Sequence, residues 1–250
     1  MSNRYREFPP PPGLARVIGC VWCLVPGSGD GLAQMDRIYP DGATDIVVSA
    51  GTVAVHGPAQ SFRLMSGCAE MVGFRIRGGA PRTVLGVSPA ELGPAPVSLG
   101  TLWGRRGREF EACVADIGAP AARAAATAAF LAGQVPDAGH LDAAVLEAVC
   151  RIDRAPDGLV RSAAHDAGLS ELQMRRRFRD NVGLGIRQYA RITRFQRLLD
   201  AARLHKRRFG ATPPGWAALA FEQGFADQAH LIREVRAFTG LTPAALLLTI

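Results

Sequence analysis

The chain has 250 residues and a formal net charge of +7, with 48% hydrophobic and 20% charged residues. This composition is typical of a globular protein that buries a core, and the length corresponds to one or two domains. No stretch approaches the ~18 consecutive apolar residues of a membrane helix, and the N-terminus lacks the apolar segment of a secretion signal. We therefore expect a cytoplasmic protein without a membrane partner.

Residues 1–98 are rich in glycine and proline and predict a β-rich domain. Short β-type runs lie between turn signals such as Pro40-Asp41-Gly42, in which proline presets φ and glycine tolerates positive φ. The predicted strands span residues 17–25, 45–48, 52–56, 62–65 and 71–77. Several short strands at this spacing predict a small sheet, sandwich or barrel.

Residues 99–155 differ in character and predict a helical linker. Alanine-rich and amphipathic patterns indicate helices over 106–117, 119–132 and 141–152. The apolar stripes of these helices make the segment the expected seat of dimerisation or of signal transfer. The turn signal Pro156-Asp157-Gly158 then interrupts the chain, and we place the last domain boundary before it.

Residues 156–250 are predicted to be helical throughout, and they carry most of the excess charge. Residues 1–140 hold 12 basic and 11 acidic residues, whereas residues 141–250 hold 17 basic and 11 acidic residues. Helices are expected over 159–167, 171–181, 186–204, 216–223, 227–239 and 243–248. Such an asymmetry indicates a nucleic-acid or membrane partner for the basic half, and the alternative is a solvated arginine-rich surface.

The basic region repeats one helix–turn–helix pattern. Gly168 and Gly224 lie 56 residues apart, and each follows a short helix at a point where chain reversal favours left-handed geometry. Ser170 and Asp227 then stand at the N-cap of the next helix, where a side-chain oxygen accepts an orphan backbone N–H. In a helix-turn-helix unit the second helix enters the DNA major groove and the first helix supports it.

Residue spacing separates a core face from a DNA face on each predicted recognition helix. In the first helix, Met174 and Phe178 are four residues apart and should face the core. In the second, Leu231, Val235 and Phe238 form the core stripe. The outward, base-facing candidates are Leu172, Arg175, Arg176, Gln228, Ala229, Ile232 and Arg233. Arginine suits this role because its planar fork reaches guanine O6 and N7 together. Ala229 and Ile232 offer only apolar contacts, so the second unit is expected to read thymine methyl groups or to read little sequence.

The segment between the two units predicts a rigid spacer. Over residues 186–204 an apolar stripe lies among arginines, and 19 helical residues span about 28 Å at ~1.5 Å per residue. Such a spacer can separate two recognition helices by about one DNA turn of ~34 Å, so that one monomer reads two successive major grooves. The candidates for contacts with the DNA backbone are Ser170, Arg179, Arg187, Arg191, Arg194, Lys206, His230 and Arg236. For the run Lys206-Arg207-Arg208, a solvated loop is an equal alternative.

Over residues 155–248 these motifs resemble the DNA-binding domain of the AraC/XylS family of transcription regulators. The matching residues are Ala167-Gly168-Leu169-Ser170, Arg177-Phe178, Gly183 and Tyr189 in the first half, and Gly224-Phe225, Asp227-Gln228-Ala229-His230, Arg233, Phe238-Thr239-Gly240 and Thr242-Pro243 in the second. The family's base-facing positions, carried over by this resemblance, coincide with the candidates above. Ile186 replaces a common helix-starting proline, and Val235 and Leu246 replace aromatic residues. These departures lie at core positions and leave the docking surface in place.

The N-terminal half resembles a β-rich domain that takes the place of the effector-binding domain in some regulators of this family. The matching segments are Tyr5-Arg6-Glu7-Phe8, Val21-Trp22, Pro40-Asp41-Gly42, Val72-Gly73-Phe74-Arg75, Gly78-Gly79-Ala80 and Leu99-Gly100-Thr101-Leu102-Trp103-Gly104. The resemblance implies a sensor or dimerisation role. It does not identify a ligand, and the effector-binding residues are therefore unknown.

The residues that an enzyme or a metal centre would use are sparse. The first 139 residues hold one histidine, His56, which argues against a metal-dependent barrel enzyme. Cys20 and Cys23 form a CxxC, but residues i and i+3 of a strand point to opposite faces and no second CxxC completes a zinc site, so we expect core cysteines. Cys68 is a conceivable redox sensor, although nothing basic brackets it. A DNA-repair methyl acceptor would need a Cys-rich zinc cluster, which the sequence lacks. The five cysteines are odd in number and scattered, which argues against a disulfide framework.

Other conspicuous N-terminal residues have ordinary structural explanations. Asp41 and Asp45 follow a proline turn, and turn chemistry accounts for them. Trp22 and Trp103 are expected to be core anchors.

We therefore predict an α+β multidomain chain, with a β-rich, barrel- or sandwich-like sensor domain (1–98), a helical linker (99–155) and an all-α DNA-binding domain with two helix-turn-helix units (156–250). The protein is expected to be a sequence-specific transcription regulator that binds double-stranded DNA and has no catalytic residues, cofactor or metal. A small-molecule effector, RNA polymerase and a second copy of the chain are candidate partners.

Two alternatives remain: a ligand-independent regulator whose N-terminal domain only dimerises or binds protein, and an enzyme that works on DNA or a small molecule. An apolar pocket with a few polar groups would favour sensing, and a titratable cluster in an N-terminal cavity would favour the enzyme.

Overall fold

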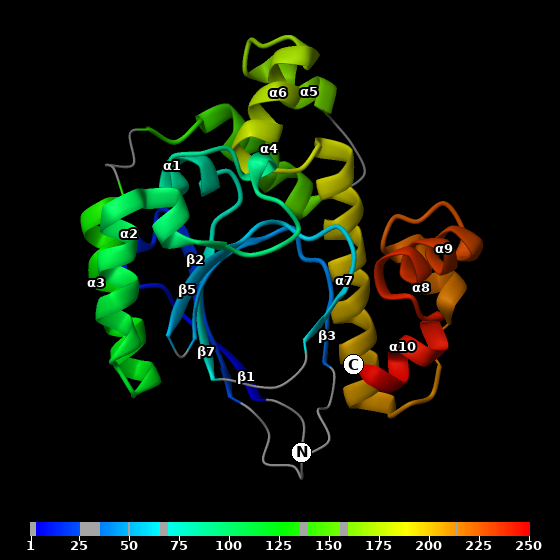
Figure 1. Ribbon diagram of the computed structural model, residues 1–250. Coiled ribbons are helices and arrows are strands. Elements are labelled where there is room, and N and C mark those ends of the chain that lie inside the picture. The colour runs from blue at the N-terminus through cyan, green and yellow to red at the C-terminus, as the bar shows by residue number, and fades with distance from the viewer. Residues whose placement is uncertain are drawn as a thin grey trace.

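The computed structural model describes residues 4–25, 36–49, 51–65, 70–135, 140–155, 160–213 and 215–250. A sheet flanked by helices forms the N-terminal part, and a group of helices forms the C-terminal part beside it (Figure 1). The predicted α+β class is confirmed. Cys68 and the predicted interruption at Pro156-Asp157-Gly158 lie outside the described residues.

The strands form two antiparallel sheets. The larger has the strand order β1-β2-β7-β4-β5-β8, and the smaller pairs β3 with β6. The strands are β1 (Arg4–Phe8), β2 (Ile18–Val25), β3 (Asp36–Ile38), β4 (Thr44–Ser49), β5 (Thr52–His56), β6 (Arg63–Met65), β7 (Met71–Ile76) and β8 (Val97–Ser98). In the described part of the chain the larger sheet is open rather than closed into a barrel, because β1 and β8 remain its edges. Of the two predicted forms, the sandwich-like layering is the one observed.

The larger sheet buries one face. Alternate residues of its central strands are apolar and point into a common core, as expected for a strand whose side chains alternate between faces. These residues are Ile46, Val48, Val53, Val55, Val72 and Phe74. Phe110, Val114 and Leu131, from two helices, cover this face and are themselves buried.

The helices from α2 onward follow the predicted order, whereas the short helix α1 was not predicted. They are α1 (Pro81–Leu85), α2 (Leu99–Ala115), α3 (Pro120–Gln134), α4 (Ala143–Arg154), α5 (Val160–Asp166), α6 (Glu171–Val182), α7 (Ile186–Phe209), α8 (Trp216–Glu222), α9 (Gln228–Thr239) and α10 (Pro243–Thr249), with short 3-10 turns η1 (Pro12–Leu14) and η2 (Pro89–Glu91). Helix α2 begins seven residues before the predicted start. Ser98 caps it, accepting the backbone N–H of Thr101, and a non-helical Gly104 kinks it where the sequence predicts the beginning. Among the described helices, none is long and apolar enough to cross a membrane.

The segment 99–155 is divided between two cores. Helices α2 and α3 pack on the sheet, whereas Val145, Ala148 and Val149 of α4 belong to the core of the C-terminal helices. That second core also contains Phe195 and Phe238, whose ring centroids lie 4.9 Å apart. The domain boundaries at 98 and 155 stay predictions, and the packing assigns α4 to its C-terminal neighbours.

Helix α7 is the longest element and crosses the C-terminal part from end to end (Figure 1). Its 24 residues exceed the predicted 19 and correspond to about 36 Å at ~1.5 Å per residue. The predicted apolar stripe is buried, and Phe195, which the sequence interpretation did not include, is part of it.

Candidate nucleic-acid interface

The first helix-turn-helix consists of α5 and α6. Gly168 joins them with φ of 64°, in the left-handed region that a residue with a Cβ rarely adopts. Ser170 begins α6 with a capping box: its Oγ accepts the N–H of Gln173 at 3.2 Å, and the Gln173 side chain accepts the N–H of Ser170 at 2.9 Å. The predicted turn and cap are both confirmed.

Helix α6 turns its predicted core residues inward and its candidate base-facing residues outward. Met174 and Phe178 are fully buried, whereas Leu172 is 58% exposed and Arg175 and Arg176 are exposed. The Arg175 guanidinium forms an ion pair with Glu171 one turn earlier, at 2.9 Å. An exposed pair of this kind contributes little to stability, so a DNA phosphate or base can replace the carboxylate.

The second helix-turn-helix consists of α8 and α9. Gly224 joins them with φ of 73°, and the Asp227 carboxylate caps α9 by accepting the N–H of His230 at 2.6 Å. Leu231, Val235 and Phe238 are buried as predicted.

The outer face of α9 presents fewer accessible polar groups than that of α6. Gln228, Ala229 and Arg233 are exposed, but Ile232 is half-buried and packs against the C-terminal core. Two side chains, Gln228 and Arg233, therefore provide the hydrogen-bonding groups of this face.

The candidate contacts with the DNA backbone divide into two groups. Ser170, Arg179, Arg187 and Arg236 are exposed. In the other four, the charged or ring group of the side chain already contacts another part of the chain. These four are Arg191, Arg194, Lys206 and His230.

Each contact within the second group has a definite partner. The Lys206 ammonium donates to the carbonyl oxygens of Leu248 and Ile250, at 3.0 and 2.6 Å. His230 Nδ1 accepts the N–H of Ala226 at 3.2 Å, and Arg194 lies over the Phe225 ring.

Arg191 makes the most extensive of these contacts. It donates to both carboxylate oxygens of Glu234 at 2.9 Å, and these hydrogen bonds to the carboxylate raise the pKa of the guanidinium. Sequence reasoning missed Glu234, although it is the one acidic residue within α9.

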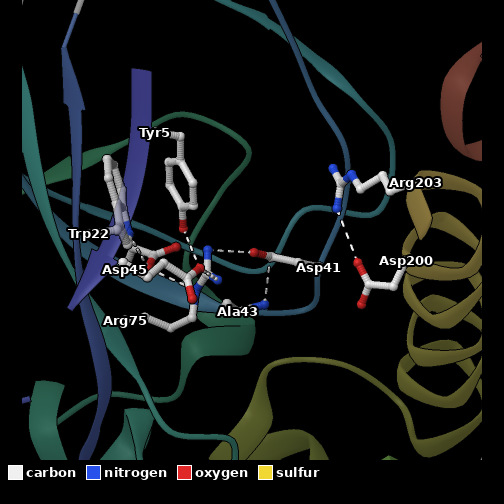
Figure 2. A network of polar contacts seen from close by, with 9 residues as sticks. Tyr5, Trp22, Asp41, Ala43, Asp45, Arg75, Asp200 and Arg203 are labelled. Atoms are coloured by element: carbon white, nitrogen blue, oxygen red, sulfur yellow. Dashed lines mark hydrogen bonds and ion pairs between the residues drawn. The ribbon is translucent and has the colours of Figure 1, made fainter. Parts of the chain in front are cut away.

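The sheet face that points away from α2 and α3 carries a polar network (Figure 2). Arg75 on β7 lies at its centre, with ion pairs to Asp41 at 2.7 Å and to Asp45 at 3.4 Å. The Trp22 indole N–H donates to Asp45 at 2.9 Å, while the Tyr5 ring lies 5.9 Å from the Trp22 ring. Burial raises the pKa of Asp45 to about 6, against the opposing attraction of Arg75.

This network alters two interpretations made from the sequence. Asp41 does accept the backbone N–H of Ala43, as turn chemistry predicts, but its other oxygen and Asp45 bind Arg75. Trp22 lies across Gly73 on the face opposite the apolar core, where a Cβ at position 73 would collide with the indole. The signal available was the alternation of side chains along a strand, which places Gly73 and Arg75 on the face opposite Phe74.

The remaining N-terminal candidates, the second tryptophan and the two cysteines of the CxxC, take part in ordinary packing or hydrogen bonding. Trp103 donates to the Leu85 carbonyl at 3.0 Å. Cys20 and Cys23 are free thiols, and Cys23 packs against the sheet core while Cys20 lies on the Arg75 side. Among the described residues, no group of three His, Cys, Asp or Glu side chains is placed to hold a metal ion.

The N-terminal part contacts the end of recognition helix α9. The backbone N–H of Phe62 donates to the Phe238 carbonyl at 3.1 Å, and Arg37 donates to the Thr239 carbonyl at 2.7 Å. Arg37 also lies over the Phe62 ring, at 4.9 Å from its centroid. Carbonyls at a helix C-terminus lack partners within the helix, so these two donors satisfy groups that would otherwise need water.

A second contact joins the turn at residues 40–42 to α7. Gln196 donates to the Pro40 carbonyl at 2.6 Å, and the ring of Tyr189 lies against Gly42. Because Asp41 of the same turn binds Arg75, the sheet network and α7 share one connecting segment.

Two family models match separate parts of the chain. Residues 163–248 match the family described as "Helix-turn-helix domain", and residues 6–98 match "Domain of unknown function (DUF6597)". No curated protein sequence matches the chain. The chain therefore carries a helix-turn-helix domain behind a β-rich domain of another family. The helix-turn-helix domain is of the AraC type, as its motifs predict.

Solved structures of ToxT from Vibrio cholerae are similar in fold. One matches over 100% of this chain and 99% of its own at 10% identity, with a TM-score of 0.45. A second, from strain O395, covers 87% and 95% at 11% identity, with a TM-score of 0.44. A third, described as bound to unsaturated fatty acid, covers 88% and 93% at 10% identity, with a TM-score of 0.43.

Proposed function

We propose that this protein is a cytoplasmic, non-enzymatic, sequence-specific transcription regulator in which α6 and α9 read successive major grooves of DNA. The observation that carries the proposal is the pair of N-capped second helices in one core, each with an exposed face that holds arginine. A double-stranded DNA partner requires helices that can enter its major groove and a positive charge that attracts its phosphates. The two exposed helix faces and the excess of basic residues in the last 110 residues meet both requirements.

Base reading is assigned to Arg175, Arg176, Gln228 and Arg233. A guanidinium can bind guanine O6 and N7, and a glutamine amide can bind adenine N6 and N7. Leu172 and Ala229 would contact thymine methyl groups, and Ile232 contributes less because its side chain is half-buried. Affinity without sequence preference would come from the exposed arginines Arg179, Arg187 and Arg236, together with Ser170 at the helix N-terminus.

The experiment measures binding of the full chain to a duplex selected from a random-sequence pool and to a mixed-sequence duplex, over a range of salt. Arg176→Ala should weaken binding to the selected duplex by roughly tenfold to a hundredfold, as expected for one bidentate base contact, and change the mixed duplex little. Equal losses on both duplexes would remove the base-reading role. A flat salt dependence of the wild type would contradict DNA binding altogether.

We further propose that a small molecule bound to the N-terminal part controls DNA binding. A hollow of about 300 Å³ lies between α1 and α2, at the lower end of the size of ligand pockets. Five apolar residues line it together with glycine and two polar side chains, and its lining is Thr83, Val84, Leu85, Gly86, Val87, Leu102, Trp103 and Gln134. The exposed lining is apolar and polar in similar measure, so a ligand of this hollow would be small and would combine an apolar part with polar groups.

The hollow has a short physical connection to the first recognition helix. Helix α1 forms one wall, and Arg82 of α1 pairs with Asp180 of α6 at 3.6 Å. A ligand changes an equilibrium only by binding two arrangements with different affinity, and in this proposal the two arrangements differ in how α1 rests on α6.

Small compounds that raise the thermal unfolding temperature of the full chain would be identified as ligands. Leu102→Trp provides the control, because the larger side chain would fill the hollow. A true effector should change the affinity for the selected duplex and lose its effect in Leu102→Trp. Ligands that bind without any change in DNA affinity would support the alternative, an N-terminal domain that only dimerises or binds protein. RNA polymerase and a second copy of the chain remain proposed partners, and sedimentation of the full chain with and without the duplex tests the second.

A further inference from the structure

The contact between Arg191 and Glu234 joins the spacer helix α7 to recognition helix α9. Arg191 Nε and Nη2 bind the two Glu234 carboxylate oxygens at 2.9 Å each, and Nη1 donates to Gln188 at 2.9 Å. The guanidinium also lies 5.2 Å from the centroid of the Phe238 ring. We propose that Arg191 is a positioning residue that fixes α9 in the orientation needed to read bases, and that it does not contact DNA phosphate.

The geometry of the pair makes it directional. Apolar side chains hold α9 in the core, but such contacts are non-directional and tolerate a roll of the helix about its axis. A bidentate arginine–carboxylate pair requires two parallel hydrogen bonds in one plane. Because Glu234 is next to the exposed Arg233, a roll of α9 that moved the base-facing side chains would also break the pair.

The Arg191–Glu234 pair differs from fully exposed ion pairs in the burial of its carboxylate. The Glu234 side chain is only 13% exposed, and Arg191 uses three of its nitrogens within the chain. Removing the Arg191 guanidinium would leave the largely buried Glu234 carboxylate unpaired, which is costly.

The same geometry argues against a phosphate contact by Arg191. A guanidinium can grip phosphate bidentately through its Nη1/Nη2 edge or its Nε/Nη2 edge. Here Nη1 donates to Gln188, and the Nε/Nη2 edge faces Glu234. A phosphate on this edge would have to displace a carboxylate and approach its negative charge. Arg187, one turn earlier on α7, is exposed and suits a phosphate better.

Two substitutions give opposite results for the two roles. Arg191→Lys keeps the charge but cannot form the planar bidentate pair, whereas lysine still binds phosphate. For a positioning role, binding of the full chain to the selected duplex should weaken on the order of tenfold, within the range of coupling in one ion-pair network. The mixed duplex and the salt slope should be unchanged. For a phosphate contact, Arg191→Lys should bind nearly as the wild type.

Glu234→Gln is the second substitution that distinguishes a positioning role of Arg191 from a phosphate contact. The amide is isosteric but cannot accept both hydrogen bonds, so a positioning role predicts weaker binding to the selected duplex. A phosphate-binding Arg191 predicts stronger binding, because a negative charge beside the DNA is removed. Selection from a random pool by either variant should lose sequence preference only in the half of the site that α9 reads, an outcome that a general loss of folding would not produce.

The matched control is Arg203→Lys. Arg203 is on the same helix and pairs with Asp200 at 3.2 Å on an exposed surface (Figure 2), so the same substitution should leave both affinities unchanged. The slope of the logarithm of the binding constant against the logarithm of the salt concentration should be about 0.9 less steep for Arg187→Gln on both duplexes, as expected for the loss of one phosphate contact. Thermal unfolding of each variant checks that the fold is retained.

The inference rests on the proposed function, and the two fail differently. A wild-type chain that selects no sequence and shows no salt dependence would refute DNA reading. If the wild type selects a DNA sequence, and Arg191→Lys binds the selected duplex as tightly as Arg203→Lys does, the positioning role alone is refuted.

Discussion

The buried carboxyl of Asp45 should make the stability of the N-terminal part decrease as pH rises. Burial raises its pKa from 3.8 to about 6, so the folded state holds the proton more tightly than the unfolded state does. The stabilising contribution is complete below pH 3.8 and is lost as pH rises through about 6. A pKa difference of about two corresponds to about 3 kcal/mol of unfolding free energy, since each pH unit is worth 1.36 kcal/mol.

Asp45→Asn isolates this effect because asparagine carries no charge at any pH. Urea unfolding of both proteins, followed by tryptophan fluorescence, gives the free energy of unfolding from about pH 4 to about pH 7. Over that range the wild type should lose about 2 kcal/mol relative to Asp45→Asn, because part of the contribution is already lost at pH 4. The control is Asp200→Asn on the exposed surface of α7, which should change stability by less than about 1 kcal/mol.

A difference between wild type and Asp45→Asn that stays constant with pH would refute the reasoning. It would mean that the attraction of Arg75, 3.4 Å away, fully offsets the cost of burying the carboxylate.

Three further predictions concern single contacts. Gly73→Ala should destabilise the N-terminal part by about 1–3 kcal/mol in thermal unfolding, because the new methyl group must displace the Trp22 indole; an unchanged melting temperature would contradict this packing. Asp227→Ala should cost about 1 kcal/mol by removing the N-cap of α9, whereas Asp227→Asn, which still accepts the hydrogen bond, should cost less. Arg37→Ala should speed amide hydrogen exchange in the last turn of α9, because it removes the donor to the Thr239 carbonyl; protection equal to the wild type would show that this contact does not hold the helix end.

The helix-turn-helix units could be predicted because their signals are local. Gly168 and Gly224 mark the turns, Ser170 and Asp227 cap the following helices, and each cap satisfies a donor three residues away. The extent of α2 could not be predicted, since Gly104, which reads as a boundary, interrupts the helix without ending it.

The strands show the limit of local patterns. The five predicted strands are present, whereas β1, β3 and β8 were not predicted. Each is five residues or fewer, and β1 consists mostly of charged residues. Such segments become strands through pairing with distant partners, as Tyr5 does with Leu24, and pairing energy is not visible in one segment.

The sequence by itself determined the kind of C-terminal domain, the turns and caps of its two units, and which residues of the recognition helices face outward, with the exception of the half-buried Ile232. These properties follow from spacing along single helices, where a side chain's neighbours are three and four residues away. Only the tertiary structure decided how charges are paired. Asp41, Asp45 and Arg75 meet from separate segments, and Arg191 meets Glu234 across 43 residues, so that an arginine predicted to contact DNA binds a carboxylate within the chain. The physical reason is that an ion pair depends on distance in space, which only the packing of the whole chain defines.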